Sequence, residues 1–152
     1  MHCRVTGRSV LGIIHFLNST VIDTFWKKQP VVEAATYGSE FYAGCISVQQ
    51  IIDQRITLRY MGVPMDGPAW LLGDNESVVK SSTIPFSTLK KRHNALSYHT
   101  VCAAISAGFI KFCHIPGREN IADTLTKHLE PGVLEPILRP HLFWDVREIV
   151  KT

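Results

Sequence analysis

The chain has 152 residues, a length that fits one domain and leaves little room for two. Hydrophobic residues make up 45% and charged residues 19% of the sequence, so the chain can bury a core, and its composition excludes disordered and collagen-like proteins. Sixteen Lys and Arg against thirteen Asp and Glu give a net charge of +3, a weak basic balance that permits a polyanionic partner without requiring one.

The N-terminal part predicts a hairpin followed by a long helix. Residues 9–17 and 20–26 are rich in β-branched and aromatic side chains and flank the polar pair Asn18 and Ser19, the pattern of two strands around a tight turn. A helix is expected over residues 36–61, with Thr36 as its N-cap and Gly62 as its stop. Apolar side chains recur there at intervals of three and four, at Phe41, Cys45, Val48, Ile52 and Ile56.

The second half alternates strands and helices. The apolar run 69–72 predicts a buried strand, residues 77–81 a short helix, and residues 87–107 a longer helix that ends at Gly108. A strand is expected over 109–115 and a last helix over 119–128, after which residues 130–152 form a tail of unassigned role. This order predicts an α/β sheet in which the later strands are parallel and covered by helices.

Three carboxylates fall at the predicted ends of elements. Asp74 follows the strand 69–72, Glu40 lies in the first turns of the first long helix, and Asp123 lies in the first turns of the last helix. If they converge at one edge of the sheet, they form an oxygen-rich site suited to Mg²⁺. Taken singly, each has a structural explanation, because an acid early in a helix complements the macrodipole and an Asp after a strand caps a turn.

The spacing of the cysteines and histidines predicts neither a disulfide framework nor a zinc site. The four cysteines, Cys3, Cys45, Cys102 and Cys113, form no C-x-x-C pair, so free thiols in a reducing compartment are expected. His93 and His99 are six residues apart and do not share a helical face as zinc ligands at i, i+4 would. No apolar run is long enough to span a membrane and no signal peptide is evident, so an intracellular protein without a membrane partner is expected.

Six short motifs in one order carry a resemblance to a known family. They begin at Arg4 (RVTGRSVLG), Trp26 (WKKQP), Ala35 (ATYGSEFYA), Gly73 (GDN), Lys91 (KRH, with Tyr98 and His99 following) and Asn120 (NIADTLTK). Together they resemble the C-terminal RNase H domain of copia-type retrotransposon polyproteins. The resemblance covers residues 4–129, so the expected organisation is an RNase H-like domain over 1–129, partial at its N-terminus, and a C-terminal tail over 130–152.

The resemblance implies both a fold and an activity. The fold is an RNase H-like mixed sheet of five strands flanked by helices, and the activity is cleavage of the RNA strand of an RNA–DNA hybrid with two Mg²⁺ ions, beside the reverse transcriptase domain of the same polyprotein. Glu40, Asp74 and Asp123 match three of the family's four metal-binding carboxylates. Lys91, Arg92 and His93 are candidates for phosphate contacts, although a solvated helix face explains such a cluster equally well. The expected location is a cytoplasmic virus-like particle or the nucleus.

One family feature has no counterpart in this sequence. The first catalytic Asp of the family lies on a central strand shortly before the V-T-G-R-S stretch, and residue 1 falls between those two places. We therefore expect the chain to lack this strand and its carboxylate, which leaves two sheet edges unpaired. Two functions remain open: an RNase H enzyme in its complete form, or a non-catalytic remnant of a retroelement polyprotein that binds nucleic acid weakly.

Overall fold

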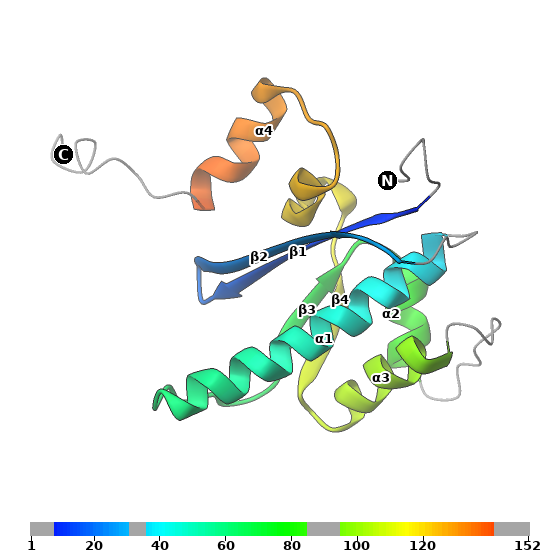
Figure 1. The fold of residues 1–152 in the computed structure, drawn as a ribbon, viewed down its shortest axis with the longest axis vertical. Helices are drawn as coiled ribbons and strands as arrows, with labels where there is room; N and C mark the ends of the chain where they lie inside the picture. The colour runs from blue at the N-terminus through cyan, green and yellow to red at the C-terminus, as the bar shows by residue number, and fades with distance from the viewer. Residues whose placement is uncertain (1–7, 31–35, 85–94, 142–152) are drawn as a thin grey trace, which may run out of the picture.

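The computed structural model describes residues 8–30, 36–84 and 95–141 of the chain. Its strands are β1 (Val10–Leu17), β2 (Thr20–Lys28), β3 (Ala69–Gly73) and β4 (Ile110–His114). The α-helices are α1 (Thr36–Tyr60), α2 (Glu76–Thr83), α3 (Ala95–Ser106) and α4 (Pro131–Leu138). The described residues also include the 3₁₀ helices η2 (Gly117–Glu119), η3 (Ile121–Leu125) and η4 (Arg139–His141). Figure 1 shows the hairpin of β1 and β2 between the layer of α1, α2 and α3 and the C-terminal α4.

The predicted hairpin is confirmed. Strands β1 and β2 pair antiparallel, with Leu17 opposite Thr20 beside the turn and Val10 opposite Lys28 at the far end. Asn18 takes the left-handed backbone conformation, with φ of 56°, which Asn tolerates better than most residues and which suits a two-residue turn. A register shift between His15 and Phe16 interrupts the ladder.

The later strands are parallel, as the alternation of strands and helices predicts. Strand β3 pairs with β4 so that Leu71 lies opposite Phe112 and Gly73 opposite His114. The connection between them carries α2 and α3, in agreement with the need of parallel strands for a crossover. As a result, the carboxyl ends of both strands lie at the same edge of the sheet. There β3 ends at Gly73, directly before Asp74, and β4 ends at His114.

The fold is mixed α/β, with two small sheets flanked by helices, and is compatible with the expected RNase H-like class. The pairs β1–β2 and β3–β4 form separate two-stranded sheets, and no strand within the described residues joins them. Each sheet therefore has edges without a strand partner in this part of the chain.

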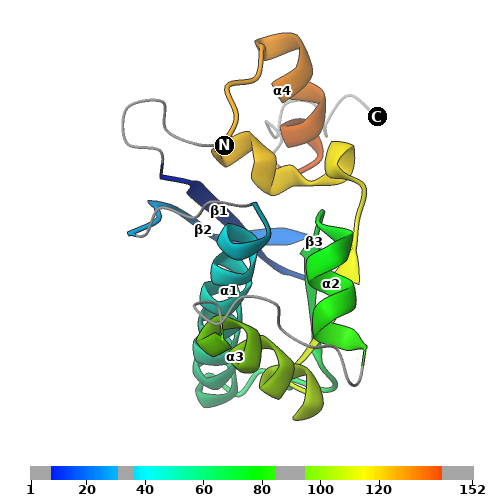
Figure 2. The ribbon, with the colours of Figure 1, turned by 90° about the vertical axis from the view of Figure 1, so that its right-hand side faces the viewer.

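The core lies between the helices and the sheet of β3 and β4. Phe41 of α1 and Val101 of α3 have no exposed surface, and the Phe41 ring meets the Tyr98 ring edge-on at 5.6 Å. The core includes Val78 and Val79 of α2 and, from the sheet, Ile110 and Phe112. Burial of these apolar side chains from four elements fixes α1, α2 and α3 on one face of β3 and β4 (Figure 2).

Helix α1 has nearly the bounds that the sequence predicts. It begins at Thr36 and ends at Tyr60, and Gly62, with φ of 79°, ends it in the left-handed conformation. Of the predicted apolar face, Phe41, Cys45 and Val48 are buried, whereas Ile56 is half exposed. A helix of 25 residues is about 38 Å long and extends beyond the elements that cover its first turns.

Two predicted helices have different outcomes. The α-helix expected over 119–128 is wrong: the segment forms the 3₁₀ helices η2 and η3, because Asn120 between them is extended and its side chain accepts a hydrogen bond from Ala122 N at 3.2 Å. Of the helix expected over 87–107, residues 95–106 are confirmed as α3 and residues 87–94 lie outside the described part. Gly108, with φ of 71°, ends α3 as expected.

The C-terminal segment packs beside the hairpin. The ring of His141 meets the ring of Phe16 edge-on at 5.3 Å, which places η4 beside the end of β1. Among the described cysteines, Cys45, Cys102 and Cys113 are free thiols. In the described parts of the chain, every helix is too short or too polar to cross a membrane.

Candidate functional site

A cavity of about 300 Å³ lies where four parts of the chain meet. Its walls come from the first half of β1, the first turns of α1, the end of β3 and residues 120–127, which we call the 120–127 turn. Glu40, Asp74 and Asp123 all line this cavity. The structure therefore brings the three carboxylates predicted from the sequence to one place, although the outer two, Glu40 and Asp123, are 83 residues apart along the chain.

The surroundings of Glu40 raise the pKa of its carboxyl group. Burial raises its pKa from the ordinary value of 4.5 to about 7, and the negative charges of Asp74 and, more weakly, Asp123 act in the same direction. A hydrogen bond from the Asn75 side chain partly offsets this rise, because it favours the carboxylate. A carboxyl group with this pKa changes its charge near neutral pH, so Glu40 can hold or release a proton in that range.

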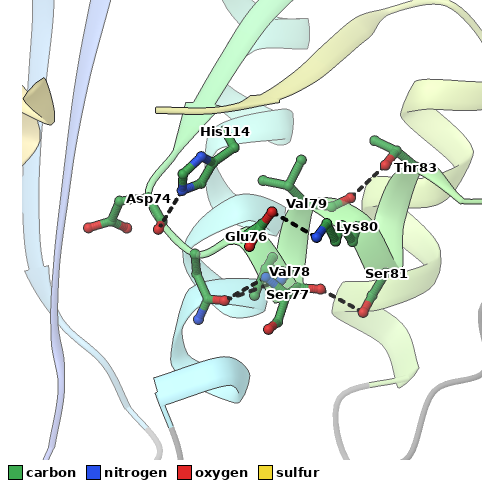
Figure 3. Close-up of polar contacts among 10 residues, drawn as sticks. Asp74, Glu76, Ser77, Val78, Val79, Lys80, Ser81, Thr83 and His114 are labelled. Carbon is green, nitrogen blue, oxygen red and sulfur yellow. Dashed lines mark hydrogen bonds and ion pairs between the residues drawn. The ribbon is translucent and has the colours of Figure 1, made fainter. Parts of the chain in front are cut away.

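Asp74 and Asn75 join the end of β3 to the start of α2. Asn75 is the N-cap of α2, and its side-chain oxygen accepts hydrogen bonds from Ser77 N at 3.0 Å and Val78 N at 3.3 Å. His114, at the end of β4, donates from Nε2 to the Asp74 carbonyl oxygen at 3.2 Å. Figure 3 shows the Asp74 carboxylate pointing away from His114 and from α2. The cap and this hydrogen bond fix the backbone, so that the Asp74 side chain faces the cavity.

The 120–127 turn supplies Asp123 together with a cation. The Lys127 ammonium lies 2.5 Å from Asp123 Oδ2, and Lys127 N donates to the Asp123 carbonyl oxygen at 2.8 Å. The turn packs directly on β1 at Gly12, where an added β-carbon would lie 2.9 Å from Leu125 Cβ and from Thr126 Cγ2. A side chain at position 12 would therefore push the turn, and with it Asp123, away from β1.

The donor chemistry of the site suits a hard divalent cation, but the present arrangement does not complete a binding site. Three carboxylates offer the oxygen ligands that Mg²⁺ prefers. Within the described residues, however, no three His, Cys, Asp or Glu side chains gather closely enough to hold a metal ion. The three acids line one cavity, and the charges of Asp74 and Asp123 act on Glu40.

The structure does not describe the other predicted site residues, and it adds two residues to the site. Lys91, Arg92 and His93, the candidates for phosphate contacts, lie outside the described residues. Asn75 and Lys127 also line the cavity and were not among the predicted site residues. The sequence contains a signal for each of them. Asn directly before a short helix is a preferred N-cap, which indicates Asn75. Lys127 follows Asp123 by four residues, which is the spacing of an ion pair on a helix.

Comparison with known proteins finds similarity to retrotransposon polyproteins. Residues of the chain are 25% identical over 121 positions to the retrovirus-related Pol polyprotein from transposon RE2 of Arabidopsis thaliana, and 27% identical over 123 positions to that from transposon RE1. The similarity supports an origin in a retrotransposon polyprotein. Each alignment covers 80% of this chain but 8% of the relative, so the chain spans a small part of those polyproteins. No family model matches the chain, and no solved structure matches it.

The raised pKa of Glu40 gives an expected pH dependence of stability. Between about pH 4.5 and pH 7 the folded chain holds a proton on Glu40 that the unfolded chain has released, so the free energy of unfolding falls as the pH rises and levels off above pH 7. Because Glu40 is only partly buried, we expect a loss of about 1–2 kcal/mol across this range. Glu40→Gln should remove this loss and make the chain more stable than wild type at pH 8.

Chemical denaturation at a series of pH values between 5 and 8 measures this effect. Glu76→Gln is the matched control, because Glu76 is exposed and its pKa is lowered by its ion pair with Lys80. That variant should retain the falling stability between pH 5 and pH 7. If Glu40→Gln has the same pH profile as wild type, Glu40 does not carry the proton.

Proposed function

We propose that this chain is an RNase H-like part of a retrotransposon polyprotein, whose complete form hydrolyses the RNA strand of RNA–DNA hybrids. The observation that carries the proposal is the meeting of Glu40, Asp74 and Asp123 on the wall of one cavity. Their positions in the first turns of α1, after β3 and in the 120–127 turn are those that the sequence motifs imply. The similarity to the two Pol polyproteins supports the retroelement origin but does not itself specify this activity.

The carboxylates would act together with divalent cations. Glu40, Asp74 and Asp123 are the residues that would hold Mg²⁺, which when bound supplies an activated nucleophile and stabilises charge on the leaving oxygen. The side chain of Asn75 would orient Glu40 through its hydrogen bond, and the α2 cap would hold Asn75 in place. Cation binding requires the Glu40 carboxylate, so affinity should rise as the pH approaches and passes about 7.

Another β-strand could fit into the cavity. The first half of β1 and the end of β3 face it from two sides, and no described strand pairs with either of these edges. Helix α1 lines the cavity with small side chains, at Ser39, Ala43, Gly44 and Ser47. A strand inserted here could pair with both edges and rest its side chains on α1. An Asp on that strand would be the fourth carboxylate that the family resemblance implies.

A second candidate function is a non-catalytic remnant with weak nucleic-acid binding. It is favoured by the finding that no three acidic, histidine or cysteine side chains of the described residues form a metal-binding group. The two functions differ in one measurable property, Mg²⁺-dependent cleavage of a labelled RNA–DNA hybrid. The test compares the 152-residue chain with a chain extended upstream, along its coding sequence, by a strand that carries an Asp.

Hybrid binding can be tested separately from cleavage. If Lys91 and Arg92 contact phosphates, replacing each with Ala should weaken binding of a hybrid and make its salt dependence less steep. Each lost contact should reduce the slope of log K against log salt by roughly 0.9. Titrations of wild type and the two variants with a fluorescent hybrid at several salt concentrations measure the slopes. Unchanged slopes would assign both side chains to a solvated surface.

A further inference from the structure

A buried glutamine links the end of the hairpin to the turn of α1 that carries Glu40. Gln29 directly follows β2, and its Nε2 donates to the Ser39 carbonyl oxygen at 2.8 Å. Both residues are buried, with exposed fractions of 3% for Gln29 and 6% for Ser39, and both line the cavity together with Glu40. Because Ser39 directly precedes Glu40, this hydrogen bond acts on the backbone beside the Glu40 side chain.

The hairpin fixes the backbone of Gln29. Its N–H donates to the Ser9 carbonyl oxygen at 2.8 Å, one residue beyond the pairing of Lys28 with Val10. This hydrogen bond continues the ladder of β1 and β2 as far as Gln29, so the side chain leaves from a fixed position. A donor that is already held by a ladder loses little further backbone freedom when it bonds to the helix.

The first turn of α1 benefits from such an anchor. The first four N–H groups of a helix have no partner within the helix, so its first turn opens more easily than its middle. In an α-helix the Ser39 carbonyl oxygen accepts from the Ala43 N–H, and its second lone pair can accept from Gln29. Tyr37 OH, which donates to Ser81 Oγ at 3.0 Å, ties the same turn to α2. Gln29 therefore ties to the hairpin a turn that Tyr37 ties to the opposite neighbour.

A second hydrogen bond links the hairpin to α1 far from this turn. His15 Nε2 donates to Gln50 Oε1 at 3.0 Å. Gln50 lies ten residues after Glu40, which is about 15 Å further along the helix. This link joins the same two elements as Gln29 does, but it does not touch the turn that carries Glu40. It therefore offers a matched comparison for the link at Gln29.

We propose that Gln29 is a positioning residue, which ties the first turn of α1 to the hairpin and so holds Glu40 near Asp74 in the cavity. The inference rests on the proposed function in so far as Glu40 is taken to act there. It goes beyond that function because it gives the WKKQP motif, residues 26–30, a part in placing a carboxylate. The hydrogen bond itself can be tested without any cleavage assay.

Amide hydrogen exchange of the 152-residue chain tests whether Gln29 holds the turn. Gln29→Met keeps the approximate length of the side chain and removes its donor. It should speed exchange of the Ala43 N–H about five- to tenfold, the factor expected from the loss of one hydrogen bond that resists opening of the turn. Gln29→Asn, whose amide is one methylene shorter, is the second variant and should have the same effect. Gln50→Met is the matched control and should leave exchange of the Ala43 N–H as in wild type.

The interaction between Glu40 and Asp74 separates positioning from a general loss of stability. The Glu40 pKa, followed by ¹³C NMR, should fall when Asp74→Asn removes the neighbouring charge. In the Gln29→Met background this fall should shrink to less than half, because Glu40 is no longer held near Asp74, whereas the Gln50→Met background should keep it.

Two results would overturn the proposal. One is the same change of the Glu40 pKa on Asp74→Asn in wild type and in both Gln29 backgrounds. The other is equal acceleration of Ala43 exchange by Gln29→Met and Gln50→Met. Failure of the proposed function has a different signature: an extended chain that does not cleave hybrid, whatever the interaction between Glu40 and Asp74.

Discussion

A chain extended upstream by a strand that carries an Asp is expected to cleave RNA–DNA hybrid in the presence of Mg²⁺, whereas the 152-residue chain is expected to leave it intact. The reason is coordination: Mg²⁺ demands near-octahedral oxygen geometry, and no three acidic, histidine or cysteine side chains of the described residues form a group that could hold a metal ion. An added strand would supply a fourth carboxylate and pair with the open edges of β1 and β3. Asp74→Asn in the extended chain should lower the cleavage rate at least about a hundredfold.

The matched control for this variant is Asp53→Asn. Asp53 lies on the exposed side of α1 and does not line the cavity, so its replacement should leave cleavage unchanged. The measurement is the rate of cleavage of an end-labelled hybrid with Mg²⁺ and with a chelator. Robust cleavage by the 152-residue chain that Asp74→Asn abolishes would show that the cavity needs no added strand. Equal effects of Asp74→Asn and Asp53→Asn would remove Asp74 from the site.

Gly12→Ala is expected to destabilise the chain by about 1–3 kcal/mol, a large effect for one methyl group. The new β-carbon would lie 2.9 Å from Leu125 Cβ and 3.0 Å from the Ala122 carbonyl oxygen, and neither atom is the end of a flexible side chain. The 120–127 turn must move, and it carries Asp123 and Lys127 with it. Chemical denaturation measures the loss of stability.

Gly44→Ala provides a matched control on the same cavity. A β-carbon at position 44 would make an ordinary contact of 3.6 Å with Val101 Cγ2. Since Ala also favours a helix interior by about 1 kcal/mol over Gly, this variant should be as stable as wild type or more stable. If Gly12→Ala were as stable as Gly44→Ala, the turn would not be held against β1 as the structure has it.

The local sequence determined most elements of this fold. The hairpin, helix α1 and the parallel pair β3–β4 follow from β-prone runs, a period of three to four, and the alternation of strands with helices. The prediction failed over 119–128, where a helical pattern of apolar residues was interrupted by Asn120. Its side chain bonds to the backbone of the next turn, and such local competition is invisible to a count of apolar positions.

The site could be predicted only in part. Element ends and motifs identified Glu40, Asp74 and Asp123, because acids at strand and helix ends converge in open α/β sheets. The raised pKa of Glu40 depends on burial and on its distance from two other acids, and both are tertiary properties. The same holds for Gly12, whose contact with the 120–127 turn joins residues more than a hundred positions apart. The sequence could not show that Lys127 would face the cavity.

Glu40, Asp74 and Asp123 line one cavity and form one electrostatically connected site. The most direct test is the pKa of Glu40, measured by ¹³C NMR of its side-chain carboxyl in wild type and in Asp74→Asn, Asp123→Asn and Asp53→Asn. We expect a pKa of about 7 in wild type, a clear fall in Asp74→Asn, a smaller fall in Asp123→Asn, and no change in Asp53→Asn. A Glu40 pKa near 4.5 in wild type, or one that neither cavity variant lowers, would contradict the claim.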